Sequence, residues 1–417
     1  MTNQTTHSTQ PEIPHLDINQ TVRFLQDMIR IPSLSNSPEE LQAAARMVQE
    51  MHALGFDEAW QDEKGNAIGL YRGANSGANS GTSRGAAWLL LTHVDIVSVG
   101  DLALWKHEPF AGVVEDGWVH GRGSVDIKGP LVAQVYSVAA LIKAGVRPPN
   151  DIVVLAAVEE ETAGQGAEYF VNHLPLKTPN GEEIQIGACI VGEPSRNRVM
   201  LGHRGVTRIL LNFQGNAHHA SRAIAEQNPY FALGTFLERL SEAQLRDHHI
   251  LGLSTIAPTM IHADTRSQNV TPNSVQLLLD WRYSTETQAE MQAIVEHLAQ
   301  GLNVSFQTWP AWTHGEQVPL FAGPGGQNSP GFFIERDHPL VKLLDAALHS
   351  VSPDAPEPGV WHFATDGRFF MDRGIPTVGF GPGNELLAHT TEEAIPVSDL
   401  VTHITVLTQV LQNPIVK

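Results

Sequence analysis

The chain has 417 residues, of which 42% are hydrophobic, so it is long enough for two domains with a sizeable core. Its 45 Asp and Glu residues outnumber its 26 Lys and Arg residues, and the formal net charge of −19 argues against nucleic acid and anionic membranes as partners. The single cysteine, Cys189, excludes an internal disulfide and a zinc site made of cysteines.

The N-terminal segment, residues 1–17, is polar and lacks the basic and apolar regions of a signal peptide. No run of about 18 apolar residues occurs in the sequence, so no transmembrane helix is expected. We therefore predict a disordered tail at 1–17 and a cytoplasmic protein.

The segments that follow alternate between helices and buried strands. The first clear helix has Ser37 as its N-cap, Pro38 at its first position and Glu40 in a capping box, and it ends at Gly55. A low-complexity stretch at 73–85 predicts a surface loop. Apolar runs predict buried strands at 87–93, 152–158, 188–192 and 377–381. This alternation is typical of an α/β/α layered domain with a central mixed sheet.

The middle of the chain has a different pattern. Residues 198–308 predict the order strand, helix, strand, strand, helix, strand, and these strands alternate apolar and polar residues. The order βαββαβ is that of a ferredoxin-like unit. We therefore predict a catalytic domain made of residues 18–197 and 309–417, with a ferredoxin-like lid domain, 198–308, inserted into it.

Histidines and carboxylates follow the predicted strands of the larger domain. His93 and Asp95 end one strand, the glutamates 159–161 end the next, and Glu193 ends a third. In open α/β sheets, ligands bind at the carboxyl ends of the strands. Asp126, just before a predicted helix, and His389, after the last strand, extend the set. Two histidines and several carboxylates at one edge are typical ligands of Zn²⁺ or a similar divalent ion.

Each of these motifs taken alone has an ordinary structural explanation. A His-x-Asp pair is usually a hydrogen-bonded surface pair, a run of glutamates is usually a solvated loop, and an aspartate before a helix is usually an N-cap. Their occurrence together at the ends of apolar runs favours a metal. We assign structural roles to the remaining histidines, which include His52, His107, His203, His218 and His262.

Seven motifs of the chain resemble the M20 metallopeptidases, in particular the group of acetylornithine deacetylase and succinyl-diaminopimelate desuccinylase. In chain order they are HVDIVSVGDLALWKHEPFAGVVEDGWVHGRGSVDIKG, EEETAG, VGEPS, GNAHHAS, NVTPNSVQLLLDWR, TDGRFF and GPGNELLAHTTEEA. Because they keep the order of the family from about residue 20 to the C-terminus, the resemblance is highly specific. It implies the same inserted-lid architecture.

The resemblance implies two divalent metal ions, expected to be Zn²⁺, with Co²⁺ or Mn²⁺ as alternatives. His93 and Glu193 would bind one ion, Glu161 and His389 the other, and Asp126 would bridge them. Asp95 would orient His93 through the second ring nitrogen. The resemblance also implies a cis peptide bond after Asp126.

Glu160 aligns with the general base of the family, which would take a proton from the attacking water and return it to the leaving amine. Glu159 replaces the aspartate of the family pattern, and we expect it either beside the ligands or turned outward. In the lid, His219 matches a histidine that stabilises the tetrahedral intermediate, often from a partner subunit. Asn269, Arg282 and Arg368 match positions near the substrate, where arginine suits a carboxylate; Arg282 could equally form a structural ion pair.

Glu193, where aminopeptidases of the family have aspartate, resembles the deacylase and carboxypeptidase branches. We therefore predict removal of an acyl group from an N-acyl amino acid by a homodimer that associates through its lid. A dipeptidase or carboxypeptidase acting on small peptides is one alternative, and a non-catalytic binding protein on the same scaffold is another. Phe363 with Ala364, and His262 with Ala263, stand where the family usually has glycine or small residues, and they would reshape the substrate pocket.

Overall fold

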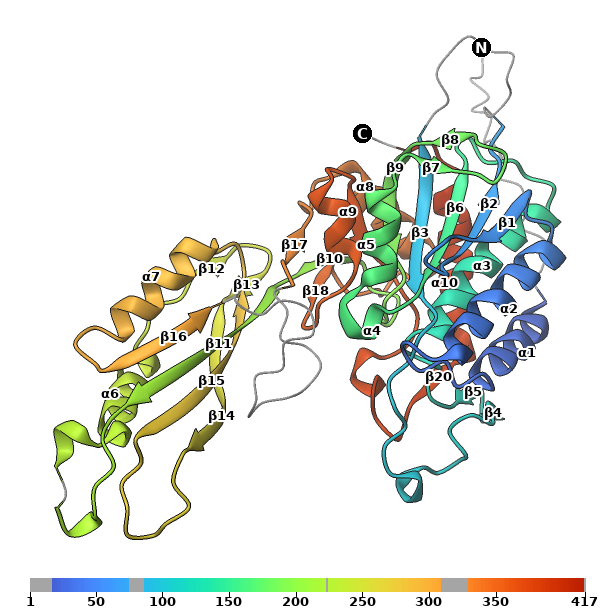
Figure 1. The fold of residues 1–417 in the computed structure, drawn as a ribbon. Helices are drawn as coiled ribbons and strands as arrows, with labels where there is room; N and C mark the ends of the chain where they lie inside the picture. The colour runs from blue at the N-terminus through green and yellow to red at the C-terminus, as the bar shows by residue number, and fades with distance from the viewer. Residues whose placement is uncertain (1–16, 75–85, 223, 309–328, 416–417) are drawn as a thin grey trace. The chain divides into compact units, whose positions relative to one another are not determined.

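The computed structural model describes residues 17–74, 86–222, 224–308 and 329–415 (Figure 1). The chain divides into two compact units. Unit 1 contains Met1–Met200, Arg336–Gly359 and Phe369–Lys417, and unit 2 contains Leu201–Glu335 and Val360–Arg368. The predicted tail, apart from Asp17, and the greater part of the predicted loop at 73–85 lie outside the described residues. The predicted boundaries at 198 and 308 stay a prediction.

Unit 1 is built on a mixed β-sheet. Its strands run in the order β1-β2-β6-β3-β9-β19, and Met200, at the start of β10 (Met200–His203), pairs with the last residue of β19. Strands β6, β3, β9 and β19 are parallel to one another, whereas β1 pairs with β2, and β2 with β6, in the antiparallel direction. The strands are β1 (Glu58–Gln61), β2 (Ala67–Tyr71), β3 (Ala87–His93), β6 (Ile152–Ala157), β9 (Ile186–Val191) and β19 (Thr377–Gly379).

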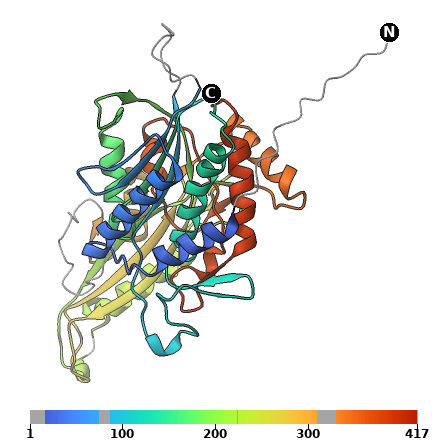
Figure 2. The same cartoon turned by 90° about the vertical axis from the view of Figure 1, so that its right-hand side faces the viewer.

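The helices of unit 1 include four that lie side by side on one side of this sheet: α1 (Ile18–Ile29), α2 (Pro38–Leu54), α3 (Lys128–Lys143) and α10 (Val397–Leu411) (Figure 2). Others are α4 (Glu160–Ala163), α5 (Gln165–Asn172), α8 (Pro339–Val351) and, from Phe369 on, α9 (Gly367–Asp372). A small sheet of order β20-β5-β4 adds β4 (Val113–Glu115), β5 (Trp118–His120) and β20 (Ala394–Pro396). The shorter elements are η1 (Leu102–Leu104), η4 (Glu385–Leu387), β7 (Leu176–Lys177) and β8 (Glu183–Ile184), and Gly359 begins β18 (Gly359–Trp361), whose other residues belong to unit 2.

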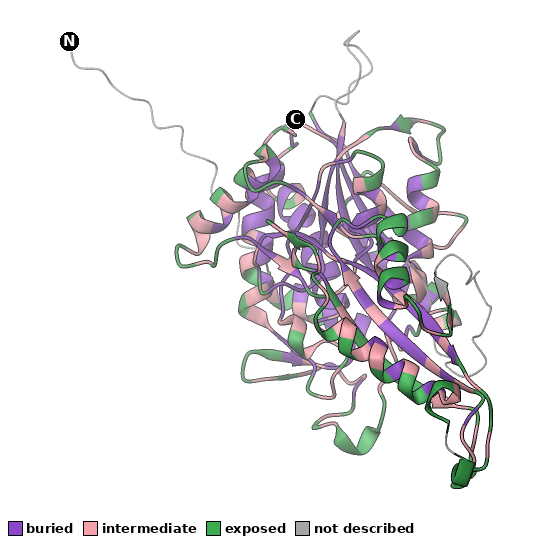
Figure 3. Cartoon of the chain, turned by 90° about the vertical axis from the view of Figure 1, so that its left-hand side faces the viewer, coloured by how far each residue is buried: buried purple, intermediate pink, exposed green. Residues whose placement is uncertain are grey.

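Burial explains why these segments form the centre of unit 1. Every residue of β3 and β6 is buried, as expected for parallel strands covered on both faces (Figure 3). The continuous apolar runs of the sequence are therefore central strands, and Cys189 is a buried thiol in β9. The predicted fold class, a mixed α/β fold with a central mixed sheet, is confirmed.

Helix α2 begins and ends where its sequence predicts. Ser37 accepts a hydrogen bond from the Glu40 N–H, and Gly55 ends the helix at φ 90°. The capping box is not closed, because the Glu40 carboxylate accepts from the N–H of Asn36 rather than that of Ser37. Glu40 is also buried, which the capping motif alone would not predict.

Unit 2 contains the predicted ferredoxin-like motif. Its four-stranded antiparallel sheet has the order β14-β15-β11-β16, and α6 packs against this sheet and against α7. The core between helices and sheet contains Phe213, Phe236, Trp281 and Val295. The elements are β11 (Gly205–Gln214), α6 (Pro229–Ser241), β14 (Thr255–Ala263), β15 (Ser274–Tyr283), α7 (Gln288–Leu298) and β16 (Val304–Thr308), with η2 (Ala220–Arg222), η3 (Ala225–Gln227), β12 (Asp247–His248), β13 (Gly252–Leu253) and β17 (Phe332–Phe333) beside them.

None of the helices in the described ranges has the length and apolar character needed to cross a membrane. The cytoplasmic location stays a prediction.

A buried histidine of α10 makes the stability of unit 1 sensitive to acid. His403 is fully buried against the Phe380 ring, and within the described residues neither of its ring nitrogens has a hydrogen-bond partner. Burial therefore lowers the pKa of His403 to about 3. In the unfolded chain histidine titrates near 6.5, so the unfolded state binds more protons between these two values. The stabilisation is complete above about pH 6.5 and is lost as the pH falls toward 3.

We expect His403→Phe, which keeps an aromatic ring against Phe380, to flatten the fall in melting temperature between pH 7 and pH 5. Calorimetry at the two pH values measures this slope. His173→Phe is the matched control, because His173 also packs on an aromatic ring, that of Tyr169, but is exposed. Equal slopes for His403→Phe and the wild type would contradict the interpretation.

Candidate metal centre

The parallel strands of unit 1 bring the predicted ligands to one edge of the sheet. His93 is the last residue of β3, and Glu160 and Glu161 follow β6. Glu193 follows β9, and His389 lies in the segment after β19. Since β6, β3, β9 and β19 are adjacent and parallel, their carboxyl ends lie at the same edge.

The side chains form two groups of three that share Asp126. In the first, His93 Nε2 lies 3.2 Å from Asp126 Oδ1 and 3.5 Å from Glu193 Oε1. In the second, His389 Nε2 lies 3.2 Å from Asp126 Oδ2 and 3.0 Å from Glu161 Oε1. The potential ligand atoms of each group lie within 4.8 Å of one another. Tetrahedral ligands about 2.1 Å from one zinc ion are about 3.4 Å apart, so both groups have a suitable spacing.

The electrostatics of the cluster also fit divalent cations. The buried Oδ1 of Asp126 accepts no hydrogen bond from the described residues, although His93 lies beside it. Burial and the Asp126 charge raise the pKa of Glu161. Hydrogen bonds to Asp126 and Glu161 raise the pKa of His389 to about 10, so without a metal a proton on this ring offsets the carboxylates. The peptide bond Asp126–Ile127 is cis, as predicted.

Asp95 contacts both the His93 ring and the backbone of Glu160 and Glu161. It is fully buried, its Oδ1 lies 3.2 Å from His93 Nδ1, and it accepts a 2.6 Å hydrogen bond from Ser35 Oγ. The backbone N–H groups of Glu160 and Glu161 each donate to it at 3.1 Å. Burial would raise the pKa of Asp95, but these hydrogen bonds and the His93 charge lower it, so it stays ionised. Asp95 therefore orients a ligand and fixes the turn that carries two more functional residues.

We expect Asp95→Asn to lower metal affinity by about 10–100-fold, the usual effect of removing a carboxylate behind a histidine ligand. The amide presents only one acceptor atom to donors that now use both carboxylate oxygens. A zinc titration against a competing chelator measures the affinity. Asp345→Asn is the matched control, because Asp345 pairs with His349 at 3.5 Å on α8. An unchanged affinity in Asp95→Asn would rule out this role.

The three consecutive glutamates have different environments because the chain turns sharply after β6. Glu159 adopts a left-handed conformation, φ 58°, and α4 begins at the next residue. This turn directs Glu159 to Lys64, whose Nζ lies 2.7 Å from its carboxylate, while the Glu159 N–H donates to Glu40. Glu160 Oε2 lies 3.9 Å from His93 Nε2, beside the metal ligands. Glu159 thus pairs with a lysine.

Glu393 holds the loop that carries Asp126, and the sequence did not predict this role. Its buried carboxylate accepts 3.0 Å hydrogen bonds from the N–H groups of Gly123, Val125 and Asp126, and it pairs with Arg122. Burial raises the pKa of Glu393 to about 7, against the effect of Arg122. This interaction holds the loop that presents Asp126. The only sequence signal is the position of Glu393 in the HTTEEA motif, four residues after His389.

Two of the predicted lid residues, His219 and Asn269, lie on neighbouring segments of unit 2. The Ala220 N–H donates to the Asn269 carbonyl at 2.8 Å, and His219 forms an isolated antiparallel bridge with Val270. Both side chains are exposed. The His219 ring contacts Ser221 Oγ at 2.8 Å. Their catalytic and substrate-binding roles stay proposals.

The two predicted arginines have structural partners in unit 2. Arg282, on β15, donates to Asp280 at 2.7 Å, which agrees with its alternative interpretation as part of an ion pair. Arg368 is buried, donates to the Thr365 carbonyl at 3.2 Å and lies 3.6 Å from Asp366. These contacts fix the orientation of each guanidinium.

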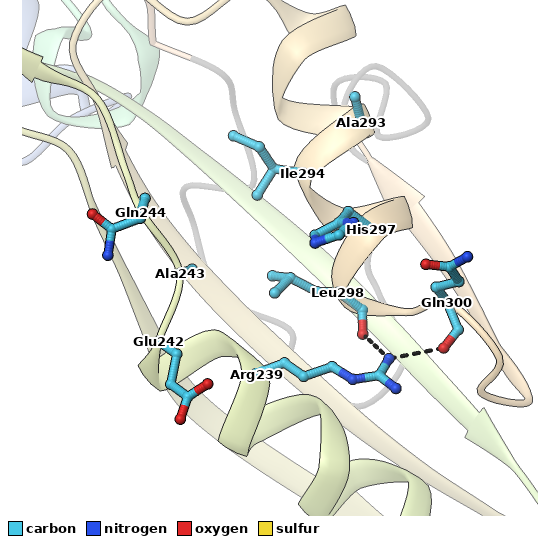
Figure 4. A pocket seen from close by; sticks show the side chains of 9 residues that line it. All are labelled: Arg239, Glu242, Ala243, Gln244, Ala293, Ile294, His297, Leu298 and Gln300. Carbon is cyan, nitrogen blue, oxygen red and sulfur yellow. Dashed lines mark hydrogen bonds between the residues drawn. The ribbon is translucent and has the colours of Figure 1, made fainter.

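Unit 2 also has a hollow of about 720 Å³ between α6 and α7 (Figure 4). Arg239 reaches across it and donates to the carbonyls of Leu298 and Gln300 at 2.9 and 2.8 Å. These bonds satisfy carbonyl groups at the end of α7, where a cation is favourable. We attribute this hollow to helix packing, since its polar groups serve the fold.

Comparisons with known proteins identify the family of the chain and agree with its fold. Residues 89–413 match the model of peptidase family M20/M25/M40. The chain is 29% identical over 392 residues to the protein YgeY of Escherichia coli (strain K12), covering 91% of each. The aminopeptidase PepT of Bacillus cereus ATCC 10987 has a similar structure, with a TM-score of 0.73, 16% identity and coverage of 95% of this chain and 98% of that one. A hydantoinase/carbamoylase family amidase of Burkholderia phymatum gives a TM-score of 0.67 at 15% identity and coverage of 96% and 98%.

Proposed function

The chain belongs to peptidase family M20/M25/M40 and is a metal-dependent hydrolase of amide bonds, and we propose that it removes the acyl group from an N-acyl amino acid. The observation that carries the proposal is the pair of ligand groups sharing Asp126, with Glu160 beside them. A non-catalytic binding protein would not need this general base.

The residues have separate roles in this reaction. His93 and Glu193 would hold one divalent ion, Glu161 and His389 the other, and Asp126 would bridge them. When bound, such ions lower the pKa of a water molecule and polarise the substrate carbonyl. Glu160 accepts the proton of the attacking water and delivers it to the leaving nitrogen.

Residues of unit 2 are proposed to act on the substrate. His219 donates a hydrogen bond to the oxygen that becomes negative in the transition state. Arg368 attracts the carboxylate of the substrate, and Asn269 helps to place it. Arg282 is the weaker candidate, because Asp280 already occupies its guanidinium.

The nature of the acyl group decides between this function and a peptidase. Glu193 at its position favours a deacylase or carboxypeptidase, and one protein of similar structure is an amidase of the hydantoinase/carbamoylase family. The aminopeptidase of similar structure favours the alternative function, hydrolysis of small peptides. A screen of metal-loaded protein over N-acetyl amino acids, dipeptides and tripeptides separates these functions. We expect the highest kcat/KM for an N-acyl amino acid, and a consistent preference for peptides would reject the deacylase.

The lid would also form a homodimer. Strand β14 is an edge of the four-stranded sheet, and its Met260 and Ile261 are 47% and 58% exposed. An exposed edge strand with apolar side chains pairs readily with another chain. We expect light scattering to give twice the chain mass for the wild type and one chain mass for Ile261→Lys. A monomeric wild type would reject the dimer.

A further inference from the structure

A second cluster of potential metal ligands lies in unit 1 and shares no residue with the candidate metal centre. It consists of His107, Glu115 and His120, which we call the hairpin triad. His107 lies between η1 and β4, Glu115 ends β4, and His120 ends β5. Sequence reasoning gave His107 a structural role, because nothing in the sequence indicates that these three residues meet.

The β4–β5 hairpin places two members of the triad on the same face. Val113 lies opposite His120 in the register, and Glu115 lies opposite Trp118. Residues two apart on a strand share a face, and directly opposite residues share it too. Glu115 and His120 are therefore diagonal neighbours, close enough for long side chains to bind one ion.

The third member is held in place by the residues around it. Trp105 Nε1 donates to the Val99 carbonyl at 2.8 Å, and the Arg122 guanidinium lies 5.2 Å from the Trp105 ring. On the other side of His107, the Pro109 carbonyl accepts a 2.9 Å hydrogen bond from the Arg122 N–H. Both flanks of His107 are thus anchored near β5.

The contacts within the triad have the spacing of a metal site. His107 Nε2 lies 3.3 Å from Glu115 Oε2, and the two imidazole rings meet edge to face with centroids 4.9 Å apart. The potential ligand atoms of the three residues lie within 4.8 Å of one another. Two histidines and a glutamate form a known ligand set for zinc, in which a water completes the tetrahedron.

A surface ion pair is the simpler explanation, since Lys106 also contacts Glu115. The Lys106 side chain is 69% exposed, so it can move into solvent when Glu115 binds a cation. Surface ion pairs contribute little free energy, so Lys106 is a weak competitor. An ion pair between Lys106 and Glu115 also does not explain why His120 lies beside His107 and Glu115.

We propose that the hairpin triad binds Zn²⁺ or a similar divalent transition-metal ion, at a site separate from the catalytic centre. The ion joins the loop that carries His107 to both strands of the hairpin. Because it binds the folded chain, it stabilises unit 1 by an amount that increases with the logarithm of the free Zn²⁺ concentration once this exceeds Kd.

The test is the zinc content of the full-length protein at a buffered free Zn²⁺ concentration, measured by mass spectrometry. We expect His107→Ala and His120→Ala each to contain one ion less than the wild type. Glu115→Gln, which keeps the side-chain shape, should bind this ion at least tenfold more weakly. Lys106→Ala should bind it more tightly. The expected result is a difference of one zinc ion between wild type and variant. It therefore does not depend on the number of ions in the catalytic centre.

His349→Ala is the matched control, because His349 pairs with Asp345 away from the hairpin and should not change the zinc content. Circular dichroism checks that each variant is folded, and hydrolysis should persist in all of them. Equal zinc contents in the wild type, His107→Ala, His120→Ala and Glu115→Gln would overturn the proposal. Hydrolysis lost in these variants would show that the triad is not separate from the catalytic centre. A wild type that hydrolyses none of the screened amides but keeps the one-ion difference would instead count against the proposed function.

Discussion

Replacing Glu160 with Gln is expected to lower kcat by about 10²–10⁴-fold, the usual contribution of a positioned general base, while the metal content stays unchanged. Glutamine has nearly the same shape as glutamate but accepts no proton near neutral pH. Glu160 belongs to neither group of metal ligands, so the ions should remain. Steady-state kinetics and zinc analysis of the same preparation measure both quantities.

Glu159→Gln is the matched control for this experiment. Glu159 precedes Glu160 in the chain, but its carboxylate pairs with Lys64 at 2.7 Å. We expect its loss to change kcat far less than the loss of Glu160, because the Glu159 carboxylate contacts Lys64 and belongs to neither group of metal ligands. A Glu160→Gln enzyme with full activity, or a Glu159→Gln enzyme as inactive as Glu160→Gln, would refute the assignment of the base.

Replacing Asp126 with Ala is expected to remove two zinc ions per chain and all measurable activity. Asp126 is the only residue shared by the two ligand groups, so each ion would lose one of its three protein ligands. Without Asp126 and the ions, the carboxylates of the remaining ligands would also repel one another. The measurement is zinc content relative to the wild type at the same buffered free Zn²⁺.

Asp101→Ala provides the control, since Asp101 is an exposed aspartate of unit 1 that caps η1. It should retain all bound zinc. Loss of a single ion in Asp126→Ala would mean that the two groups do not share a bridging carboxylate. Unchanged zinc content would reject the metal centre at this position.

The sequence predicted much of the centre because parallel strands end at a common edge. His93, Glu161 and Glu193 each follow an apolar run, and this local signal requires no knowledge of distant contacts. Asp126 and His389 lie in loops that have no periodic pattern; their positions before a predicted helix and after the last strand added them to the set, and the family resemblance supplied the division of the ligands between two ions. The structure brings all five of these residues together.

The supporting carboxylates were beyond sequence reasoning because their partners are distant in the chain. Glu40 fits a capping box locally, yet its carboxylate accepts the N–H of Glu159, 119 residues away. Glu393 accepts the N–H of Asp126 across 267 residues. Buried acceptors of this kind are determined by tertiary packing, and their local sequence looks like an ordinary helix start or loop.

The direction of Glu159 was open for a related reason. Alternation along a straight strand would put neighbouring side chains on opposite faces. The left-handed conformation at Glu159 ends the strand, so the following two glutamates lie on a helical turn that Asp95 caps through their N–H groups. Neither the turn nor its cap has a recognisable sequence signature here.

Anomalous diffraction from a crystal of the zinc-loaded protein, recorded at the zinc absorption edge, tests the central claim most directly. We predict two peaks roughly 3.5–4 Å apart, the spacing typical of paired metal ions. One peak should lie beside His93 and Glu193, the other beside Glu161 and His389, with Asp126 between them. A single peak, or two peaks that Asp126 does not bridge, would contradict the dinuclear centre.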